Sequence, residues 1–307
     1  MSSPLWFITG ASNGLGLVLT LRALRAKHRV IGSVRSRVKS GDAVKQIEAA
    51  GGQVIELDMM ESKESITKKV QAAGRIDYLV NNAGYSVVKA CESIRNPPKY
   101  LPAVTNRDLR NPGSSEQEAS AQMQTNFLGP LYTTQAALPA MRAARRGTIV
   151  NVSSVAARDP LPTCTLYSAS KGALEGMSEA LGREVSGFGI WVLVVEPGAF
   201  RTNFIAAMRD ASADGGGEAM PADYRGTETE DTLRRLEAYH GRQRGDPAKG
   251  VERIFEAVVG EGMAGPLRGK VGRLVIGEDA LLRINKANEA FEGELKLQQE
   301  IARSTDF

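Results

Sequence analysis

A short apolar run that enters a helix through a glycine-rich turn constrains the fold of this chain most strongly. Residues 5–8 (LWFI) read as a buried strand, residues 9–16 (TGASNGLG) hold three glycines, and residues 17–28 carry apolar side chains at helical spacing. Glycines in this context let the backbone approach a phosphate, and the helix N-terminus offers free N–H groups. The spacing is G-x-x-x-G-x-G, and the alternative is a glycine turn that binds no nucleotide.

The same alternation of strand and helix continues along the chain. Strand-like runs at 30–34, 53–57, 77–80, 148–152 and 273–276 are interspersed with helical patterns at 41–50, 61–73 and 248–259. Such alternation is typical of a parallel sheet with right-handed crossovers and helices on both faces. We therefore predict an α/β fold, a Rossmann-type doubly wound parallel sheet, formed by residues 1–307 as a single domain.

The end of the second predicted strand indicates which nicotinamide cofactor fits. An acidic residue at this position binds the ribose 2′-hydroxyl of NAD, whereas an Arg accommodates the 2′-phosphate of NADP. Here the strand is followed by Arg35-Ser36-Arg37 without an acid, which favours NADP(H). Arg37 and Lys39 either add to this site or are solvated, and for Lys39 we expect a solvated position.

Residues 151–171 (NVSSVAARDPLPTCTLYSASK) contain the side chains that we expect to carry chemistry. Tyr167 and Lys171 are four apart and share one face of a helix. A Lys⁺ beside a phenol favours the phenolate, so we expect a lowered Tyr167 pKa. Ser154 follows the predicted strand 148–152, at the sheet edge where ligands bind in parallel α/β folds. The alternative is an ordinary helix start with an exposed Tyr and Lys.

Composition narrows the class of protein further. The net charge of +4 is spread along the chain, which gives no nucleic-acid footprint. Two cysteines and two histidines, without metal-ligand spacing, indicate no metal site and fit a reducing compartment. No apolar run reaches the ~20 residues that span a bilayer. The expectation is a soluble cytoplasmic protein.

Together with NNAG at 81–84 and PG at 197–198, these motifs resemble the short-chain dehydrogenases/reductases over residues 5 to about 203. The resemblance implies NADP(H) binding by a set of residues distributed over the glycine turn and the strand ends. They are Gly10, Ser12, Asn13, Gly14, Leu15, Gly16, Arg35, Asp58, Met59, Asn82, Ala83, Gly84, Tyr167, Lys171, Pro197, Gly198 and Thr202. It also implies homo-oligomers, dimers or tetramers.

The resemblance assigns a catalytic role to each of four residues. Tyr167 would be the general acid in reduction and the base in oxidation, and Lys171 would lower its pKa and bind the nicotinamide ribose. Ser154 would hydrogen-bond the substrate oxygen; its offset from Tyr167 favours it over Ser153. Asn126 would complete a proton relay through a water, and its alternative is an interior Asn bonded only to backbone.

Three segments depart from the compact pattern. Residues 95–113, rich in proline, lengthen the interval between Gly84 and Asn126 and read as an inserted loop. This loop either reaches the active site or a subunit contact, or is a tolerated insertion on the surface. Residues 200–246 correspond to the family's substrate lid, where Phe200, Phe204, Ile205 and Met208 are lid or core residues. Residues 279–307 form a charged helical pattern that could pack on its own subunit or on a partner.

We therefore expect an NADP(H)-dependent oxidoreductase that moves hydride between the nicotinamide and a carbonyl or secondary alcohol of a largely apolar small molecule, in the reductive direction. The resemblance extends to members that act on bulky apolar ketones and alcohols. One alternative keeps the fold but catalyses a non-redox proton transfer such as dehydration, isomerisation or cyclisation. Another is a nucleotide-binding protein without turnover.

Overall fold

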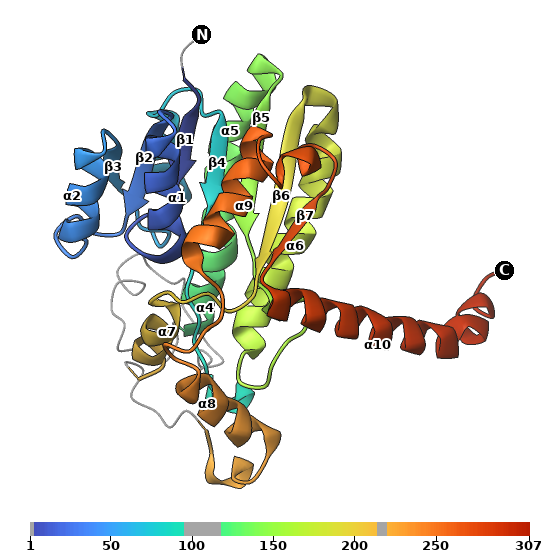
Figure 1. Cartoon of the computed structure of the whole chain (residues 1–307). Coiled ribbons are helices and arrows are strands. Elements are labelled where there is room, and N and C mark those ends of the chain that lie inside the picture. Colours follow the sequence, from blue (N-terminus) through green and yellow to red (C-terminus); the bar gives the residue numbers. More distant parts are fainter. Residues whose placement is uncertain (1–2, 95–117, 214–219) are drawn as a thin grey trace.

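A seven-stranded parallel sheet forms the centre of the computed structural model, which describes residues 3–94, 118–213 and 220–307. The strand order is β3-β2-β1-β4-β5-β6-β7 (Figure 1). The strands are β1 (Leu5–Ile8), β2 (Arg29–Val34), β3 (Gln53–Glu56), β4 (Tyr78–Asn81), β5 (Gly147–Val152), β6 (Ile190–Pro197) and β7 (Arg273–Ile276). The order reverses between β1 and β4, which is the switch point at which doubly wound folds bind ligands.

Helices cover both faces of the sheet, as the alternation predicts. One face packs against α1 (Gly14–Arg25), α2 (Gly41–Ala49) and α9 (Pro247–Val259). The other packs against α3 (Lys63–Gln71), α5 (Gly129–Ala144) and α6 (Thr165–Val185). The remaining helices are α4 (Glu118–Met123), α7 (Phe204–Ala213), α8 (Glu228–Ala238) and α10 (Glu278–Arg303). The predicted doubly wound fold is confirmed.

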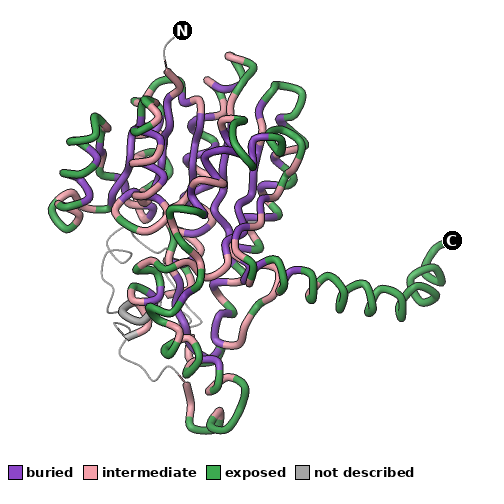
Figure 2. The backbone as a smooth tube through the Cα atoms, viewed as in Figure 1, coloured by how far each residue is buried: buried purple, intermediate pink, exposed green. Residues whose placement is uncertain are grey.

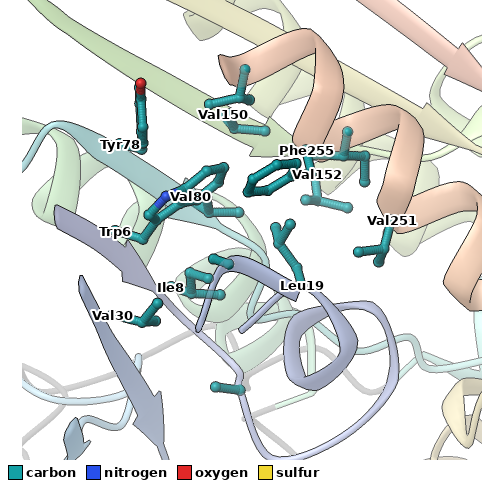
Figure 3. Packing of buried hydrophobic residues seen from close by; sticks show 14 of the residues in the cluster. Trp6, Ile8, Leu19, Val30, Tyr78, Val80, Val150, Val152, Val251 and Phe255 are labelled. Atoms are coloured by element: carbon teal, nitrogen blue, oxygen red, sulfur yellow. The ribbon is translucent and has the colours of Figure 1, made fainter. Parts of the chain in front are cut away.

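Side-chain alternation along β1 divides the core into two layers. Trp6 and Ile8 enter the layer beneath α1 and α9, whereas Leu5 and Phe7 enter the layer beneath α3 and α5. In the first layer the Trp6 ring stacks on Phe255 with centroids 5.6 Å apart (Figure 3), and its indole N–H donates to His28 Nδ1 at 2.9 Å. Burial of this aromatic group fixes α9 on the sheet.

The C-terminal helix α10 leaves the body of the molecule soon after it begins (Figures 1 and 2). Among its residues only Ala280 and Ile284 are buried. Large apolar side chains along the rest of the helix are exposed: Leu281, Leu282, Phe291, Leu295, Leu297 and Ile301. The predicted helical tail thus packs on its own subunit only at its start.

The structure does not test every expectation. The predicted insertion at 95–113 lies outside the described residues. Within the described ranges, every helix is too short or too polar to cross a membrane. The lid segment contains α7, a short 3-10 turn at Ala222–Tyr224 and α8.

Candidate active site

The glycine turn after β1 is built for close backbone approach. Gly10 and Gly14 have φ values of +67° and +55°, which side chains other than glycine rarely adopt. A Cβ on Gly16 would lie 2.3 Å from the Gly10 carbonyl oxygen and 2.4 Å from Asn82 Nδ2. The turn therefore needs glycine at these three positions for its own geometry.

The segment after β4 locks this turn in place. The Thr9 hydroxyl accepts hydrogen bonds from the backbone N–H groups of Asn82 and Ala83, both at 3.0 Å. Asn82 Nδ2 in turn donates to the carbonyl oxygens of Thr9 and Gly10, at 3.0 and 3.1 Å. The side chain of Asn82 is thus occupied by the protein itself, and it shapes the turn from behind.

The N-terminus of α1 fits an anionic group. Asn13 is the N-cap residue but makes no side-chain capping bond, and the first turn of the helix holds no acidic residue. Ser12 and Asn13 lie at the surface of the turn, and Leu15 packs against the core beneath it. Free N–H groups and the positive end of the helix dipole therefore face the place where a pyrophosphate would bind.

The three basic residues after β2 differ in their surroundings. Arg35 is exposed and makes no side-chain hydrogen bond to any residue that the structure describes. Arg37 is held by Glu48 at 2.6 Å and by the Val54 carbonyl at 2.8 Å. Lys39 is exposed. Arg35 and Lys39 are thus exposed, while Arg37 ties the β2 and β3 segments together.

Asp58 and Met59, two of the expected cofactor-binding residues, differ in their surroundings. Asp58 is half-buried, and its Oδ1 accepts from the Met60 N–H at 3.0 Å. The Met59 side chain is 4% exposed and fills the space above Gly129, where a Cβ would lie 2.7 Å from its sulfur. Any ligand contact of Met59 is therefore limited to its backbone.

Ser154 and Tyr167 meet at the carboxyl edge of the sheet. Ser154 follows β5, and Tyr167 lies in the first turn of α6 with 8% of its surface exposed. The Ser154 hydroxyl lies close enough to the Tyr167 phenol to act on its pKa, which it lowers. The neighbouring Ser153 is buried and donates instead to Glu175 Oε1 at 2.6 Å. The structure thus brings the expected serine, and not its neighbour, to the tyrosine.

Lys171 is buried beside this pair, one helical turn further along. Its Nζ donates to the Val152 carbonyl at 2.8 Å and lies 5.8 Å from the centroid of the Tyr167 ring. Burial lowers the pKa of Lys171 to about 8, while the Glu175 carboxylate acts in the opposite direction. At neutral pH the ammonium form is still the more abundant one.

The expectation of a lowered Tyr167 pKa is wrong for this structure. Burial raises the pKa of Tyr167 to about 12, and the nearby Ser154 hydroxyl only partly offsets that effect. The low-dielectric surroundings penalise the phenolate more than nearby groups stabilise it. The phenol is therefore protonated throughout the neutral range, in the state of a proton donor.

Asn126 lies in a π-helical turn, Gln124–Leu128, between α4 and α5. Its Nδ2 donates to the Tyr85 carbonyl at 2.9 Å and to Ser170 Oγ at 3.0 Å, and its Oδ1 accepts from the Tyr85 N–H at 3.1 Å. A Cβ on Gly84 would approach Asn126 Oδ1 and Lys171 Nζ to 3.1 and 3.3 Å. Asn126 and Lys171 therefore border one small space, and Asn126 is not bonded to backbone alone.

The segment after β6 faces the glycine turn. Pro197 is buried at the end of the strand, and Gly198 donates its N–H to the Ile276 carbonyl at 2.9 Å. The Thr202 side chain lies opposite Gly14, where a Cβ would be 3.6 Å from Thr202 Cβ. These contacts bring the two ends of the expected cofactor site together.

An apolar wall adjoins the expected catalytic side chains. Phe204 lies 5.8 Å from Tyr167, measured between ring centroids. Ile205 and Met208 of α7 pack with Val88 and Cys164. Phe200, by contrast, packs against the core, and Gly250 leaves room for its ring. Three of the four apolar lid candidates thus lie at this wall, and Phe200 is a core residue.

A buried ionic cluster beneath α6 was not anticipated. Arg273 of β7 contacts the carboxylates of Glu175, Glu179 and Glu196. Glu175 follows Lys171 by one helical turn, and this spacing is the only signal of the cluster in the sequence. Through Glu175 the cluster acts on the Lys171 ammonium.

A cavity elsewhere in the molecule is separate from the site described above. A cavity of about 550 Å³ opens at the opposite edge of the sheet, between Arg75, Arg146, Trp191 and Arg268, and contains none of the residues above. Within the described residues, no group of three His, Cys, Asp or Glu side chains could hold a metal ion.

Glycine turn, helix N-terminus and Ser-Tyr-Lys arrangement together define an oxidoreductase that binds a nicotinamide dinucleotide. The family model described as short chain dehydrogenase matches residues 5–213. The chain belongs to the short-chain dehydrogenase/reductase family, whose members transfer hydride between a nicotinamide and a CH–OH or C=O group.

Named relatives agree with this assignment. Oxidoreductase claN of Passalora fulva is 40% identical over 205 residues, which are 66% of this chain and 84% of that protein. The 3-ketodihydrosphingosine reductase of Bacteroides thetaiotaomicron is 34% identical over 66% of each chain. A short-chain dehydrogenase from Streptomyces avermitilis superposes with a TM-score of 0.75 at 32% identity and full coverage of both chains.

Proposed function

We propose that this protein is an NADPH-dependent reductase of largely apolar ketones or aldehydes. The observation that carries the proposal is the adjacent Ser154–Tyr167 pair with buried Lys171 beside it, next to the glycine turn. When bound, the cofactor supplies the hydride. Tyr167 donates the proton to the substrate oxygen, and Ser154 hydrogen-bonds that oxygen as negative charge develops on it.

Lys171 and Asn126 support the proton transfer. The Lys171 ammonium stabilises the phenolate that forms when Tyr167 has given up its proton, and it binds the nicotinamide ribose. Asn126 holds the Tyr85 backbone on the other side of the small space near Gly84, from which a water would return a proton to Lys171. The relay thus runs from Asn126 through Lys171 to Tyr167.

The choice of NADP(H) rests on Arg35. Its exposed guanidinium follows β2, and the nearest candidate replacement, Arg37, is already bound to Glu48 and Val54. A guanidinium can bind a phosphate with two parallel, charge-assisted hydrogen bonds, whereas it binds a neutral ribose hydroxyl more weakly. Asp58, at the end of β3, would contact the adenine from the other side.

Reduction of an apolar substrate fits the surroundings of Tyr167. The raised pKa of Tyr167 makes it a proton donor at neutral pH, whereas oxidation and base-initiated isomerisation both need the phenolate. The wall of Phe204, Ile205 and Met208 would contact apolar carbon atoms. The ketone of the named relative 3-ketodihydrosphingosine reductase belongs to the same class.

We further infer that the protein works as a homo-oligomer, a dimer or a tetramer, in the cytoplasm. The exposed apolar side chains of α10, such as Phe291 at 60% and Leu297 at 83%, favour burial against another copy. Cys91 and Cys164 are both free, which fits a reducing compartment.

The first experiment is a fluorescence titration of the purified protein with NADPH and NADH, followed by a panel of ketones, aldehydes and alcohols with the tighter cofactor. We expect tighter binding of NADPH and its oxidation by apolar ketones. NADPH binding without oxidation by any carbonyl compound would contradict the reductase assignment and favour a non-redox proton transfer.

A further inference from the structure

The base of α10, residues 278–284, lies beside the candidate active site. The helix follows β7 after one residue, Gly277, and β7 pairs with β6 so that Ile276 is opposite Pro197. The start of the helix therefore reaches the backbone that follows β6. Its next turn contacts the backbone that follows β5.

Asp279 holds the first of these two segments. Its Oδ2 accepts a hydrogen bond from the Ala199 N–H at 2.8 Å. Its Oδ1 lies so close to Gly198 that a Cβ there would be 2.1 Å away. The carboxylate thus fixes the peptide plane between residues 198 and 199, and it explains why position 198 must be glycine.

Arg283 holds the second segment. Its Nε donates to Asp159 Oδ2 and its Nη2 to the Asp159 carbonyl oxygen. Val155 packs against Ala280 and Ile284 of the helix base. Val155 begins the 3-10 turn Val155–Ala157, and Ser154 caps this turn by accepting the Ala156 N–H at 3.1 Å. The helix base therefore packs directly against Val155, the residue that follows Ser154.

We propose that Asp279 and Arg283 are positioning residues, which hold the Ser154 turn and the backbone of residues 198–199 at a fixed separation. The proposal rests on the proposed function, in which Ser154 binds the substrate oxygen, and on the expectation that Pro197, Gly198 and Thr202 bind the cofactor. Neither residue touches the reacting atoms. Both set the distance over which hydride moves, because one rigid helix contacts both segments.

The test compares Asp279→Ala, Asp279→Asn and Arg283→Ala with Glu289→Ala, an exposed residue further along the same helix. Steady-state kinetics with NADPH and with its C4-deuterated form give kcat, KM and the isotope effect. We expect kcat to fall about 10- to 100-fold in the two alanine variants, since displacements of about 1 Å cost up to ~10²-fold. The isotope effect on kcat should rise and the KM for NADPH should change little.

Asp279→Asn separates positioning from a general loss of stability. An amide oxygen still accepts the Ala199 N–H, so this variant should recover kcat to within a few-fold of the parent. A merely structural role would lower the fraction of protein that binds NADPH while leaving kcat per bound cofactor and the isotope effect unchanged. That result in both Asp279→Ala and Arg283→Ala would overturn the proposal. Because the Arg283 side chain is partly exposed, Arg283→Ala keeps the test decisive if Asp279→Ala does not fold.

Amide hydrogen exchange decides the proposal independently of turnover. Asp279→Ala should speed exchange in residues 198–202, and Arg283→Ala should speed it in residues 154–159. If the parent protein reduces no carbonyl compound, the proposed function fails while these exchange rates still test the helix base. Unchanged exchange in both segments would overturn the positioning role whatever the reaction is.

Discussion

Ser153 and Ser154 are neighbours in the chain, yet their hydroxyl groups hydrogen-bond in different directions. Ser153 donates to Glu175 beneath α6, whereas Ser154 accepts from the Ala156 N–H and lies beside Tyr167 at the sheet edge. Consecutive residues of an extended backbone point to opposite faces, which separates the two hydroxyls. Only Ser154 is placed to meet a substrate oxygen beside Tyr167.

Replacing each serine with alanine should therefore give two different defects. Ser154→Ala removes a donor to the developing oxyanion, and kcat should fall about 10²-fold. Ser153→Ala should keep kcat within a few-fold but lower the free energy of unfolding by about 1–3 kcal/mol, because Glu175 loses a buried hydrogen bond. Steady-state kinetics and denaturant unfolding measure both. A large loss of kcat in Ser153→Ala alone would reverse the assignment.

Tyr167→Phe should abolish turnover and preserve cofactor binding. The substitution removes the proton donor but keeps the buried ring and its packing near Phe204. Single-turnover oxidation of NADPH should become undetectable, while the Kd for NADPH from fluorescence stays within a few-fold. Loss of both turnover and NADPH binding would indicate that the hydroxyl is structural.

The pH dependence of reduction should report the ionisation of Lys171. The pKa of Lys171 is about 8, so its ammonium is present below pH 8 and is lost as the pH rises through that value. Tyr167, with a pKa raised to about 12, remains protonated over the same range. We expect kcat/KM for NADPH to be level below pH 8 and to decline above it. A level profile up to pH 10 would contradict this assignment.

Glu175→Gln should move that decline to lower pH. The Glu175 carboxylate raises the pKa of Lys171, and the neutral amide would not. Glu196→Gln is the matched control, since Glu196 contacts the same Arg273 but is not a cause of the Lys171 shift. The pH profiles of both variants test whether the Glu175 carboxylate is coupled to the Lys171 ammonium. Coinciding profiles would show that there is no such coupling.

Arg35→Ala should weaken NADPH binding selectively. Loss of a charge-assisted contact of about 1.5–3 kcal/mol corresponds to a roughly 10- to 100-fold rise in the Kd for NADPH. The Kd for NADH should remain nearly unchanged, because NADH lacks the 2′-phosphate. Lys39→Ala, another exposed cation after β2, should leave both values unchanged. Equal weakening of NADH and NADPH would rule out a 2′-phosphate contact.

Local sequence patterns predicted most of the fold because each pattern had a local cause. Apolar runs, helical spacing and glycines specified β1, α1 and the turn between them, and four-residue spacing placed Tyr167 and Lys171 on one face. The contacts that tune the site join distant positions instead. Arg273 lies 98 residues from Glu175, and Asp279 lies 80 residues from Ala199.

The prediction of a lowered Tyr167 pKa failed for a similar reason. Charge proximity can be deduced from spacing along a helix, but the cost of burial depends on everything that packs around the phenol. Phe204, which lies close to its ring, comes from a segment that sequence analysis placed only broadly, in the substrate lid. The reversal of the shift therefore became visible only in three dimensions.

The π-helical turn Gln124–Leu128 makes chain length at this point as important as residue identity. A π-helical turn holds one residue more than the α-helical turn it replaces. Deleting one neighbouring residue would restore the α-helix and rotate Asn126 by about 100° relative to α5. Asn126 would then leave Tyr85 and Ser170 although every site residue was still encoded. Single-residue deletions between α4 and α5 should thus impair the enzyme as severely as a substitution of Asn126 itself.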